Sequence, residues 1–169
     1  MTTTRTLLRI LRLAAFGAVA AAAFTAKAKE PVLPNPPLPV IPRHTITVTD
    51  SGAKGDGMTD NAKAIQSAIE KCAKAGGGTV VVPKGDFLCG PIQLASRINL
   101  RVEKDATLRM LPLEKYPGST KTPADFISGE GLQDVSISGE GTIDGQGAPW
   151  WPFAKEKNAS RPRMIKLSK

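Results

Sequence analysis

The side chains that most often carry chemistry are few in this chain. It has one histidine, His44, and two cysteines, Cys72 and Cys89. Structural zinc sites of the usual kind use four Cys or His ligands, and three such side chains cannot supply them. For the two cysteines the sequence leaves two alternatives open, a disulfide bond or two buried free thiols.

Two glycine-rich stretches have some features of phosphate-binding loops. Residues 139–147 (GEGTIDGQG) have the wrong glycine spacing for a dinucleotide loop, and no helical pattern follows them. Residues 52–57 (GAKGDG) lack the Gly-Lys-Ser/Thr ending of a Walker loop. The acids Asp50, Asp56 and Asp60 do not have the spacing of a calcium loop. We therefore expect no cofactor and no metal ion.

The acidic residues could take part in general acid–base catalysis. It needs carboxyl groups that converge on one rigid face, one to donate a proton and another to activate water. No clustered Asp/Glu pair in the sequence suits this task. Asp144 is the most prominent single acid, but the preference of Asp for turns favours a turn between strands. We assign no catalytic residue.

The composition is that of an ordinary globular domain. The chain has 169 residues, of which 41% are apolar, 22% are charged and 5% are aromatic. These values exclude collagen-like, coiled-coil and wholly disordered chains, and the length suggests about one domain. The core must be aliphatic, and 16 Gly and 14 Pro predict many turns.

Residues 1–28 have the layout of a secretory signal peptide. Three arginines precede an uncharged apolar run (residues 13–24), and an Ala-Lys-Ala cleavage pattern ends at Ala28. The run is too short to span a bilayer, which takes about 20 residues. Cleavage would remove four basic residues and lower the net charge from +8 to +4. We expect an exported protein, periplasmic or extracellular, with no membrane span in the mature chain and no nucleic-acid partner.

Residues 29–44 are expected to form a linker. Six prolines occur in PVLPNPPLPVIP (residues 31–42), which favours an extended, semi-rigid spacer. The domain itself is then expected over residues 45–169.

The domain begins with a strand and one helix. Alternating Thr and apolar residues at 45–49 predict a short strand. A helix follows, with Asp60 as its expected N-cap and the glycines at 76–78 as its stop. Its predicted apolar face consists of Ile65, Ala68, Ile69, Cys72 and Ala75.

Short strands fill the rest of the chain, separated by Gly, Pro, Asn or Asp. Residues 97–110 and 134–145 share a rhythm of strand, polar turn and strand, as in a weak internal repeat. With no second helical pattern, this disfavours a doubly wound α/β fold and leaves a sandwich, a barrel or a parallel β-helix. The expected strands lie at residues 79–82, 87–88, 92–94, 98–102, 106–111, 126–127, 135–137, 141–143 and 164–167.

Two longer motifs carry a family resemblance. Residues 46–94 resemble the N-terminal module of the pectin-degrading β-helix enzymes, a motif that phage tailspikes and pectate lyases share. Residues 139–151 (GEGTIDGQGAPWW), followed by Arg161-Pro162-Arg163, resemble bacterial polygalacturonases of glycoside hydrolase family 28. The resemblance implies an all-β fold, a right-handed parallel β-helix whose N-terminal coils are capped by one α-helix. It also implies a pectin or polygalacturonate substrate, whose α-1,4-galacturonosyl links are hydrolysed with inversion and without a metal.

The chain departs from that family in its catalytic signature. The family's Asn-Thr-Asp, Asp-Asp, Gly-His-Gly and Arg-Ile-Lys motifs are absent. Thr59-Asp60-Asn61 is interpreted as a helix cap, and Arg163-Met164-Ile165-Lys166 has an extra Met. We therefore expect an N-terminal fragment of a polygalacturonase that is inactive alone. The alternatives are a non-catalytic carbohydrate-binding or capping module and a pectate-lyase or tailspike relative.

Trp150 and Trp151 fit two roles equally well. Paired tryptophans could stack on sugar rings or could pack over the edge of a coil as large apolar plugs.

Overall fold

The computed structural model describes residues 37–118 and 121–169. The chain divides into two units, Met1–Pro36 and Pro37–Lys169, and the second is described here. The expected signal peptide (residues 1–28) and the first half of the expected linker lie outside the described residues. No helix in the described part of the chain has the length and apolar character needed to cross a membrane.

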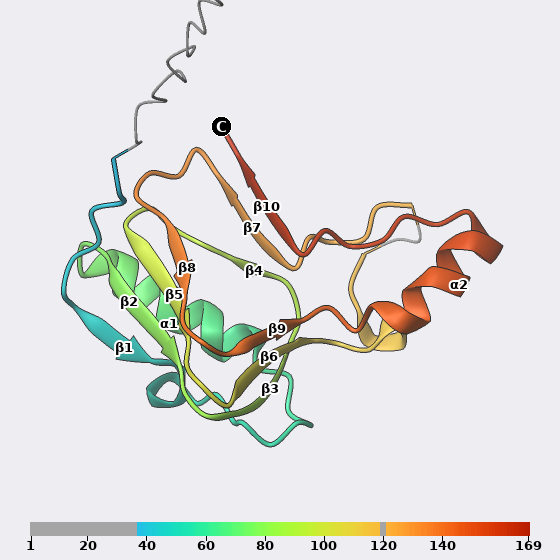
Figure 1. Ribbon diagram of the computed structural model, residues 1–169, viewed down its shortest axis with the longest axis horizontal. Helices are drawn as coiled ribbons and strands as arrows, with labels where there is room; N and C mark the ends of the chain where they lie inside the picture. Colours follow the sequence, from blue (N-terminus) through green and yellow to red (C-terminus); the bar gives the residue numbers. More distant parts are fainter. Residues whose placement is uncertain (1–36, 119–120) are drawn as a thin grey trace, which may run out of the picture. The chain divides into compact units, whose positions relative to one another are not determined.

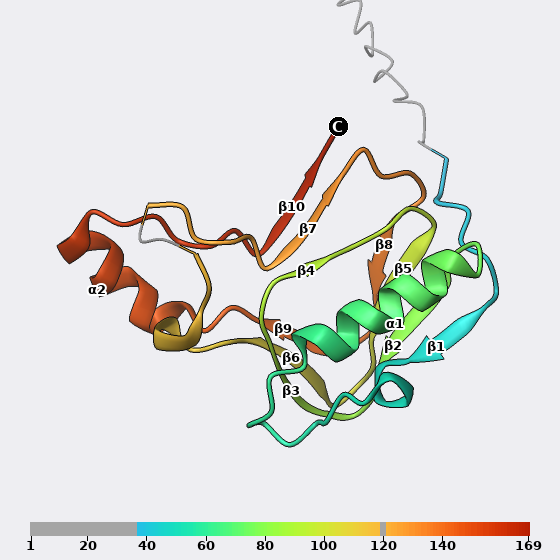
Figure 2. The same ribbon diagram turned by 180° about the vertical axis from the view of Figure 1, so that it is seen from behind.

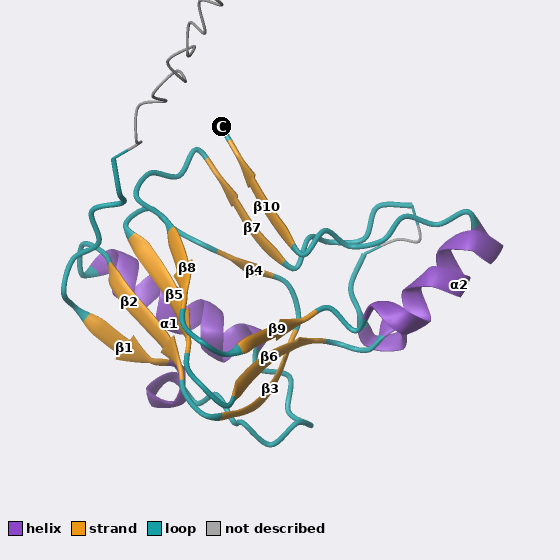
Figure 3. Ribbon diagram, in the orientation of Figure 1, coloured by secondary structure: helices purple, strands orange, loops and turns teal. Residues whose placement is uncertain are grey.

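The strands form three parallel sheets (Figures 1 and 3). Sheet A orders its strands β1-β2-β5-β8, sheet B orders them β3-β6-β9, and sheet C orders them β4-β7-β10. Three strands in succession thus visit sheets A, B and C before the chain returns to A. This is a parallel β-helix, as expected. The strands are β1 (Thr45–Thr47), β2 (Gly78–Val82), β3 (Gly85–Cys89), β4 (Ile92–Gln93), β5 (Ile98–Val102), β6 (Ala106–Met110), β7 (Ile127–Glu130), β8 (Ser136–Ser138), β9 (Thr142–Asp144) and β10 (Ile165–Ser168).

The two halves of the predicted internal repeat stack directly on each other. Leu100 of β5 pairs with Ile137 of β8, and Leu108 of β6 pairs with Ile143 of β9. Because side chains alternate between the faces of a strand, this register brings aliphatic residues together on the inner side. The repeat is therefore one coil following another.

An aliphatic core runs through the inside of the coils. β5 and β6 both bury every second residue, and Leu100 and Leu108 are fully buried. Phe87 and Phe126 are the largest fully buried side chains. In β10, Ile165 continues the row that starts with Ile92 and Ile127, but it is 47% exposed because no further described strand covers it.

Helix α1 (Ala62–Lys74) covers the other end of the coils (Figure 2). It contacts β1, β2, β4 and β5. Four members of the predicted apolar face are buried; Ala75, the fifth, lies just past the helix end. The helix packs its apolar side on the stack and closes the end of the core, as predicted.

The ends of α1 agree with the prediction in part. The N-cap is Asn61, one residue later than expected, although the Asp60 carboxylate accepts a hydrogen bond from Ala62 N at 3.0 Å. At the other end, Gly76 and Gly77 have φ of 93° and 105°. A Cβ on Gly77 would lie 2.5 Å from the Arg97 carbonyl oxygen, so this stop requires glycine.

A second helix, α2 (Gly147–Lys157), was not expected from the sequence. It begins at Gly147, the last residue of the glycine-rich stretch 139–147, after which the sequence showed no helical pattern. Its apolar residues do not gather on one face of the helix, Pro152 lies inside it, and Trp150 is its one buried residue. Local pattern therefore gives no helix signal here.

Both long insertions leave the coil at the same corner, between a sheet B strand and a sheet C strand. One comprises residues 111–126, with a short 3-10 turn at Leu113–Lys115, and the other comprises residues 145–164, with α2. They contact each other: Tyr116 and Trp150 stack edge to face, with ring centroids 5.7 Å apart. Lys121 Nζ also donates to the Asn158 carbonyl oxygen at 2.6 Å.

Cys72 and Cys89 are both free and both buried, which corresponds to the second alternative from the sequence. Burial raises the pKa of each thiol, and for Cys89 the nearby Asp60 carboxylate adds to the effect. Because the thiolate is the reactive form, we expect a thiol reagent at pH 8 to react slowly with the native protein and to modify both cysteines after unfolding. Mass spectrometry should show no 2 Da gain on reduction; such a gain would contradict the free-thiol assignment.

Candidate functional site

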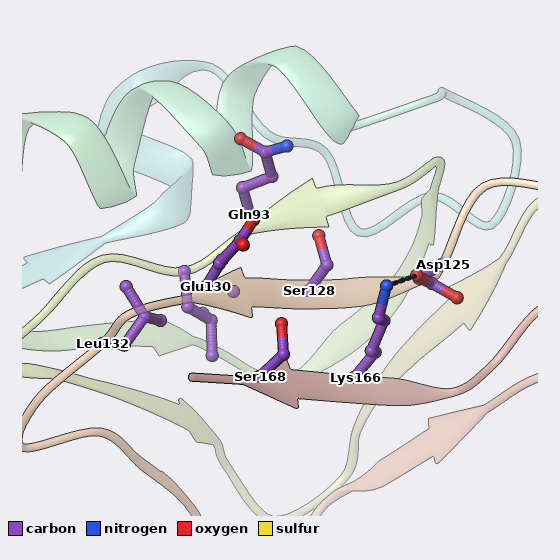
Figure 4. Close-up of a pocket in the computed structure, with 9 residues that line it drawn as sticks. Gln93, Asp125, Ser128, Glu130, Leu132, Lys166 and Ser168 are labelled. Atoms are coloured by element: carbon purple, nitrogen blue, oxygen red, sulfur yellow. Dashed lines mark ion pairs between the residues drawn. The ribbon is translucent and has the colours of Figure 1, made fainter.

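A polar groove crosses the outer face of sheet C (Figure 4). It has a volume of about 410 Å³ and is open to solvent on one side. Side chains from β4, β7 and β10 line it, together with residues just before and after β7. The lining residues are Gln93, Leu94, Asp125, Ser128, Gly129, Glu130, Leu132, Lys166 and Ser168.

The register of the sheet places the polar side chains in rows. Gln93, Ser128 and Lys166 form one row, and Glu130 lies beside Ser168 in the next. The preceding row, Ile92, Ile127 and Ile165, belongs to the inner side of the coil. Because side chains alternate along a strand, the first row must point outward. The same pairing that builds the core therefore builds the groove.

Helix α1 holds the free edge of sheet C. The Gln66 side chain accepts a hydrogen bond from Gln93 N at 2.9 Å and donates one to the Gln93 carbonyl oxygen at 3.3 Å. This amide satisfies the backbone of the short strand β4, which would otherwise be an open edge. A second pocket along this edge is also lined by Gln66, Glu70 and Pro91.

Asp125 is the charged centre of the groove. Arg163 donates to its two carboxylate oxygens at 2.7 and 3.2 Å, and Lys166 Nζ lies 3.7 Å away. The Asp125 side chain is 16% exposed, whereas that of Arg163 is 63% exposed. The Arg163 hydrogen bond lowers the pKa of Asp125, and the same pair raises the pKa of Arg163. Asp125 therefore stays a carboxylate and is unsuited to be a general acid, which needs a raised pKa.

We expect the Asp125–Arg163 pair to stabilise the fold only while Asp125 is ionised. Its folded pKa is below the unfolded value of about 3.9, so its contribution is complete above that value and is lost as the pH falls through the folded pKa. Asp125→Asn should therefore be less stable than the parent at pH 7, and the difference should shrink below about pH 4. Urea unfolding at several pH values measures this. A difference that stays constant down to pH 2 would contradict it.

A second acidic cluster lies on the outer face of sheet B. Arg109 Nη2 is 2.7 Å from Asp86 Oδ2, and Arg109 Nε is 3.8 Å from Asp144 Oδ2. The other oxygen of Asp144 accepts a hydrogen bond from Gln146 N at 2.9 Å. Asp144 thus holds the turn after β9, as predicted. One guanidinium thus forms ion pairs with both carboxylates and ties three coils together, although Asp86 Oδ1 has no hydrogen-bond partner among the described residues.

The other acids considered in the sequence stabilise local structure. Asp56 accepts hydrogen bonds from Met58 N, Thr59 N and the Thr59 hydroxyl, which lower its pKa to about 2. Asp60 also accepts a hydrogen bond from Gly90 N. In the described ranges, no three His, Cys, Asp or Glu side chains gather as metal ligands would.

The two tryptophans have different environments, so each of the two proposed roles is open to only one of them. Trp150 is 5% exposed and packs edge to face against Tyr116 and Phe153. Trp151 is 66% exposed. Trp150 is therefore the apolar plug, and Trp151 alone offers a ring to solvent.

Sequence reasoning did not find the groove. Gln93, Ser128 and Lys166 are separated by 35 and 38 positions, and none belongs to a local motif. The usable signal was the coil period: one polar residue recurs beside an isoleucine in three successive coils, at residues 92–93, 127–128 and 165–166.

Comparisons with known proteins agree with this architecture. Residues 45–101 match the family described as rhamnogalacturonase A/epimerase, pectate lyase-like. A grapevine (Vitis vinifera) protein named as a probable polygalacturonase is 35% identical over 144 residues, which cover 73% of this chain and 29% of the relative. This chain therefore spans about a third of the length of such relatives.

Solved structures give the same result. The exopolygalacturonase of Thermotoga maritima superposes with a TM-score of 0.63 at 33% identity, covering 75% of this chain and 32% of that one. The polygalacturonase of Erwinia carotovora superposes with a TM-score of 0.57 at 26% identity, covering 83% and 42%. The coils described here are therefore those of a polygalacturonase-like protein with the pectate-lyase-like parallel β-helix fold.

Proposed function

We propose that this chain forms the N-terminal coils of a polygalacturonase-type hydrolase that cleaves α-1,4-galacturonosyl links in pectin, with inversion and without a metal. The observation that carries the proposal is the three-sheet coil capped by α1, which superposes on an exopolygalacturonase over 75% of this chain at 33% identity. The coils supply a rigid, capped start on which further coils can stack.

We propose no acid pair for hydrolysis among the described residues. Inversion needs a protonated carboxylic acid and a carboxylate about 6.5–9.5 Å from each other, with room for water between them. Asp125 is ion-paired with Arg163 and Lys166, and Asp86 and Asp144 share Arg109. We assign no catalytic residue to this chain and place the catalytic carboxylates of the proposed enzyme elsewhere.

We therefore expect the purified 169-residue chain to release no reducing ends from polygalacturonate. A full-length polygalacturonase at the same molar concentration is the positive control, and the Asp125→Asn variant is the internal one. If the chain did release reducing ends, and if Asp125→Asn abolished that activity, the groove would be catalytic and the assignment of no catalytic residue would be wrong.

Sequencing the transcript past the Lys169 codon tests whether the catalytic carboxylates lie elsewhere in the protein. We expect in-frame Asn-Thr-Asp and Gly-His-Gly motifs.

We further propose that the protein is exported to the periplasm or the extracellular space. The support is the signal-peptide pattern of residues 1–28. N-terminal sequencing of the mature protein from the producing organism tests this. A start at Lys29 is expected, whereas a start at Met1 in the cytosolic fraction would contradict it.

A second candidate function is polysaccharide binding without cleavage. The groove on sheet C favours it, because hydroxyl, amide and carboxylate groups of three strands converge on one open surface. Two results together would favour binding over hydrolysis. The chain would be retarded in a polygalacturonate affinity gel without cleaving the polymer, and the transcript would contain no Asn-Thr-Asp or Gly-His-Gly motif after the Lys169 codon.

A further inference from the structure

A second cavity, the corner pocket, lies where the two insertions leave the coil. Its volume is about 570 Å³. The ends of β6 and β9, the start of α2 and the segment that returns to β10 line it. The lining residues are Met110, Gly145, Gly147, Trp150, Trp151, Ala159, Ser160, Arg161, Pro162, Arg163 and Met164.

The walls of the corner pocket are held in place on both sides of α2. Gln146 Nε2 donates to the Met110 carbonyl oxygen and so ties the start of α2 to β6. Asn158, with φ of 46°, ends α2, and Arg163 anchors the approach to β10 through Asp125. The walls of the corner pocket are therefore fixed by side-chain contacts. The Asp125–Arg163 ion pair links the two cavities, because Asp125 lines the sheet C groove and Arg163 lines the corner pocket.

The aromatic wall of the pocket has one covered and one exposed ring. Trp150 is 5% exposed and packs edge to face on Tyr116 and Phe153. Beside it, Trp151 leaves 66% of its surface in water. The apolar C–H face of a sugar ring would cover the exposed ring of Trp151.

The charge around the pocket is positive. Arg163 is neutralised by Asp125, but no ion pair joins Arg161 to any described residue. Lys155 and Lys157 lie in the last turn of α2, and Glu156 is the one acid in the stretch 154–163. A guanidinium presents a fork of donors that matches a carboxylate. This surface therefore favours an anionic ligand, unlike the sheet C groove, where Asp125 and Glu130 balance the cations.

From these features we propose that the corner pocket binds a uronate residue of an acidic polysaccharide. Trp151 stacks on the C–H face of the sugar ring, and Arg161 pairs with its carboxylate. This inference rests on the proposed function for the identity of the polymer, galacturonan. It adds a place on this chain where the polymer is held apart from any catalytic carboxylates.

Titration with trigalacturonate, followed by tryptophan fluorescence and calorimetry, tests the proposal. We expect saturable binding, weakened about tenfold or more in both Trp151→Ala and Arg161→Gln, because losing a stacked ring or a charge-assisted pair costs at least about 1.4 kcal/mol. Both side chains are exposed, so both variants should keep the parent's thermal unfolding curve. Arg43→Gln, which removes the same charge from an exposed position outside the pocket, should bind like the parent.

A further comparison examines the mode of binding. The methyl-esterified trimer keeps the ring and loses the charge, so it should bind about tenfold or more weaker. Equal binding would overturn carboxylate recognition by Arg161.

The remaining outcomes separate this inference from the proposed function. Binding of trigalacturonate that is unaffected by Trp151→Ala and Arg161→Gln but lost in Lys166→Gln would place the ligand in the sheet C groove. That result would overturn the corner pocket as the binding site but would leave galacturonan as the proposed polymer. Binding of trimannuronate but not trigalacturonate, sensitive to the same two pocket variants, would support the pocket and overturn pectin as substrate. Binding of neither would overturn the pocket.

Discussion

Replacing Asn61 with alanine is expected to destabilise the fold by about 3 kcal/mol, one of the two largest effects predicted here. Asn61 is the one buried polar residue of the described core, with 1% of its surface exposed. Its amide donates to the carbonyl oxygens of Lys54, Thr59 and Leu88 at 2.8–3.1 Å and accepts from Lys54 N at 2.7 Å. Alanine would remove this partner from Lys54 N and from the carbonyl oxygens of Lys54 and Thr59 where α1 meets the first coil, whereas the Leu88 carbonyl oxygen would keep its bond from the backbone N of residue 61.

Urea unfolding followed by circular dichroism measures this loss. Asn99→Ala is the matched control, because Asn99 lies on the outer face of sheet A and accepts one side-chain hydrogen bond, from Ser138 at 2.9 Å. It should cost about 1 kcal/mol or less. Asn61→Asp should be at least as harmful as Asn61→Ala, since a carboxylate would face three carbonyl oxygens. A loss below 1 kcal/mol in Asn61→Ala would show that the network contributes little.

Replacing Leu108 with alanine should also cost about 3 kcal/mol. Leu108 is fully buried in the middle of β6, between Phe87 of the coil before and Ile143 of the coil after. Truncating it removes apolar contacts in both directions and leaves a cavity that neighbouring coils cannot fill by moving, because their backbones are hydrogen-bonded in register. Losses of 2–5 kcal/mol are typical of such sites.

The same experiment has a matched control in the expected linker. Leu38 is 84% exposed, so Leu38→Ala removes the same atoms and should change the free energy of unfolding by no more than about 0.5 kcal/mol. If both variants were equally stable, the row of inner residues would not be a tightly packed core. If both lost stability, residues near position 38 would have to pack against the domain.

Features with a local cause could be predicted from the sequence. Helix α1 has an apolar face at helical spacing, a polar residue at its start and glycines at its end, so its existence and buried side were correct. The predicted N-cap was one residue too early, because Asp60 and Asn61 both suit that position. Asn61 is the N-cap, but its side-chain amide donates to backbone carbonyl oxygens outside the helix and makes no capping hydrogen bond. The coil repeat was visible because aliphatic strands recur with similar turns.

Helix α2 and the sheet C groove could not be predicted from any local pattern in the sequence. α2 has Pro152 in its interior, and its one buried residue, Trp150, packs on Tyr116 of the other insertion. Tertiary contact thus overrides a weak helical tendency. The groove side chains are ordinary Gln, Ser and Lys residues far apart in sequence, and only the parallel register places them in one row.

The aliphatic coil, its α1 cap and the family resemblance could all be predicted from the amino-acid sequence, because periodicity and turn residues act over a few neighbouring positions. Which charges meet is set only when the chain folds. Asp125 with Arg163, and Arg109 between Asp86 and Asp144, are partners 23 to 38 positions apart. The tertiary structure also decides which tryptophan is covered and which faces water. Stacking of coils sets these pairings, and stacking depends on register between distant strands, which no short stretch of residues encodes.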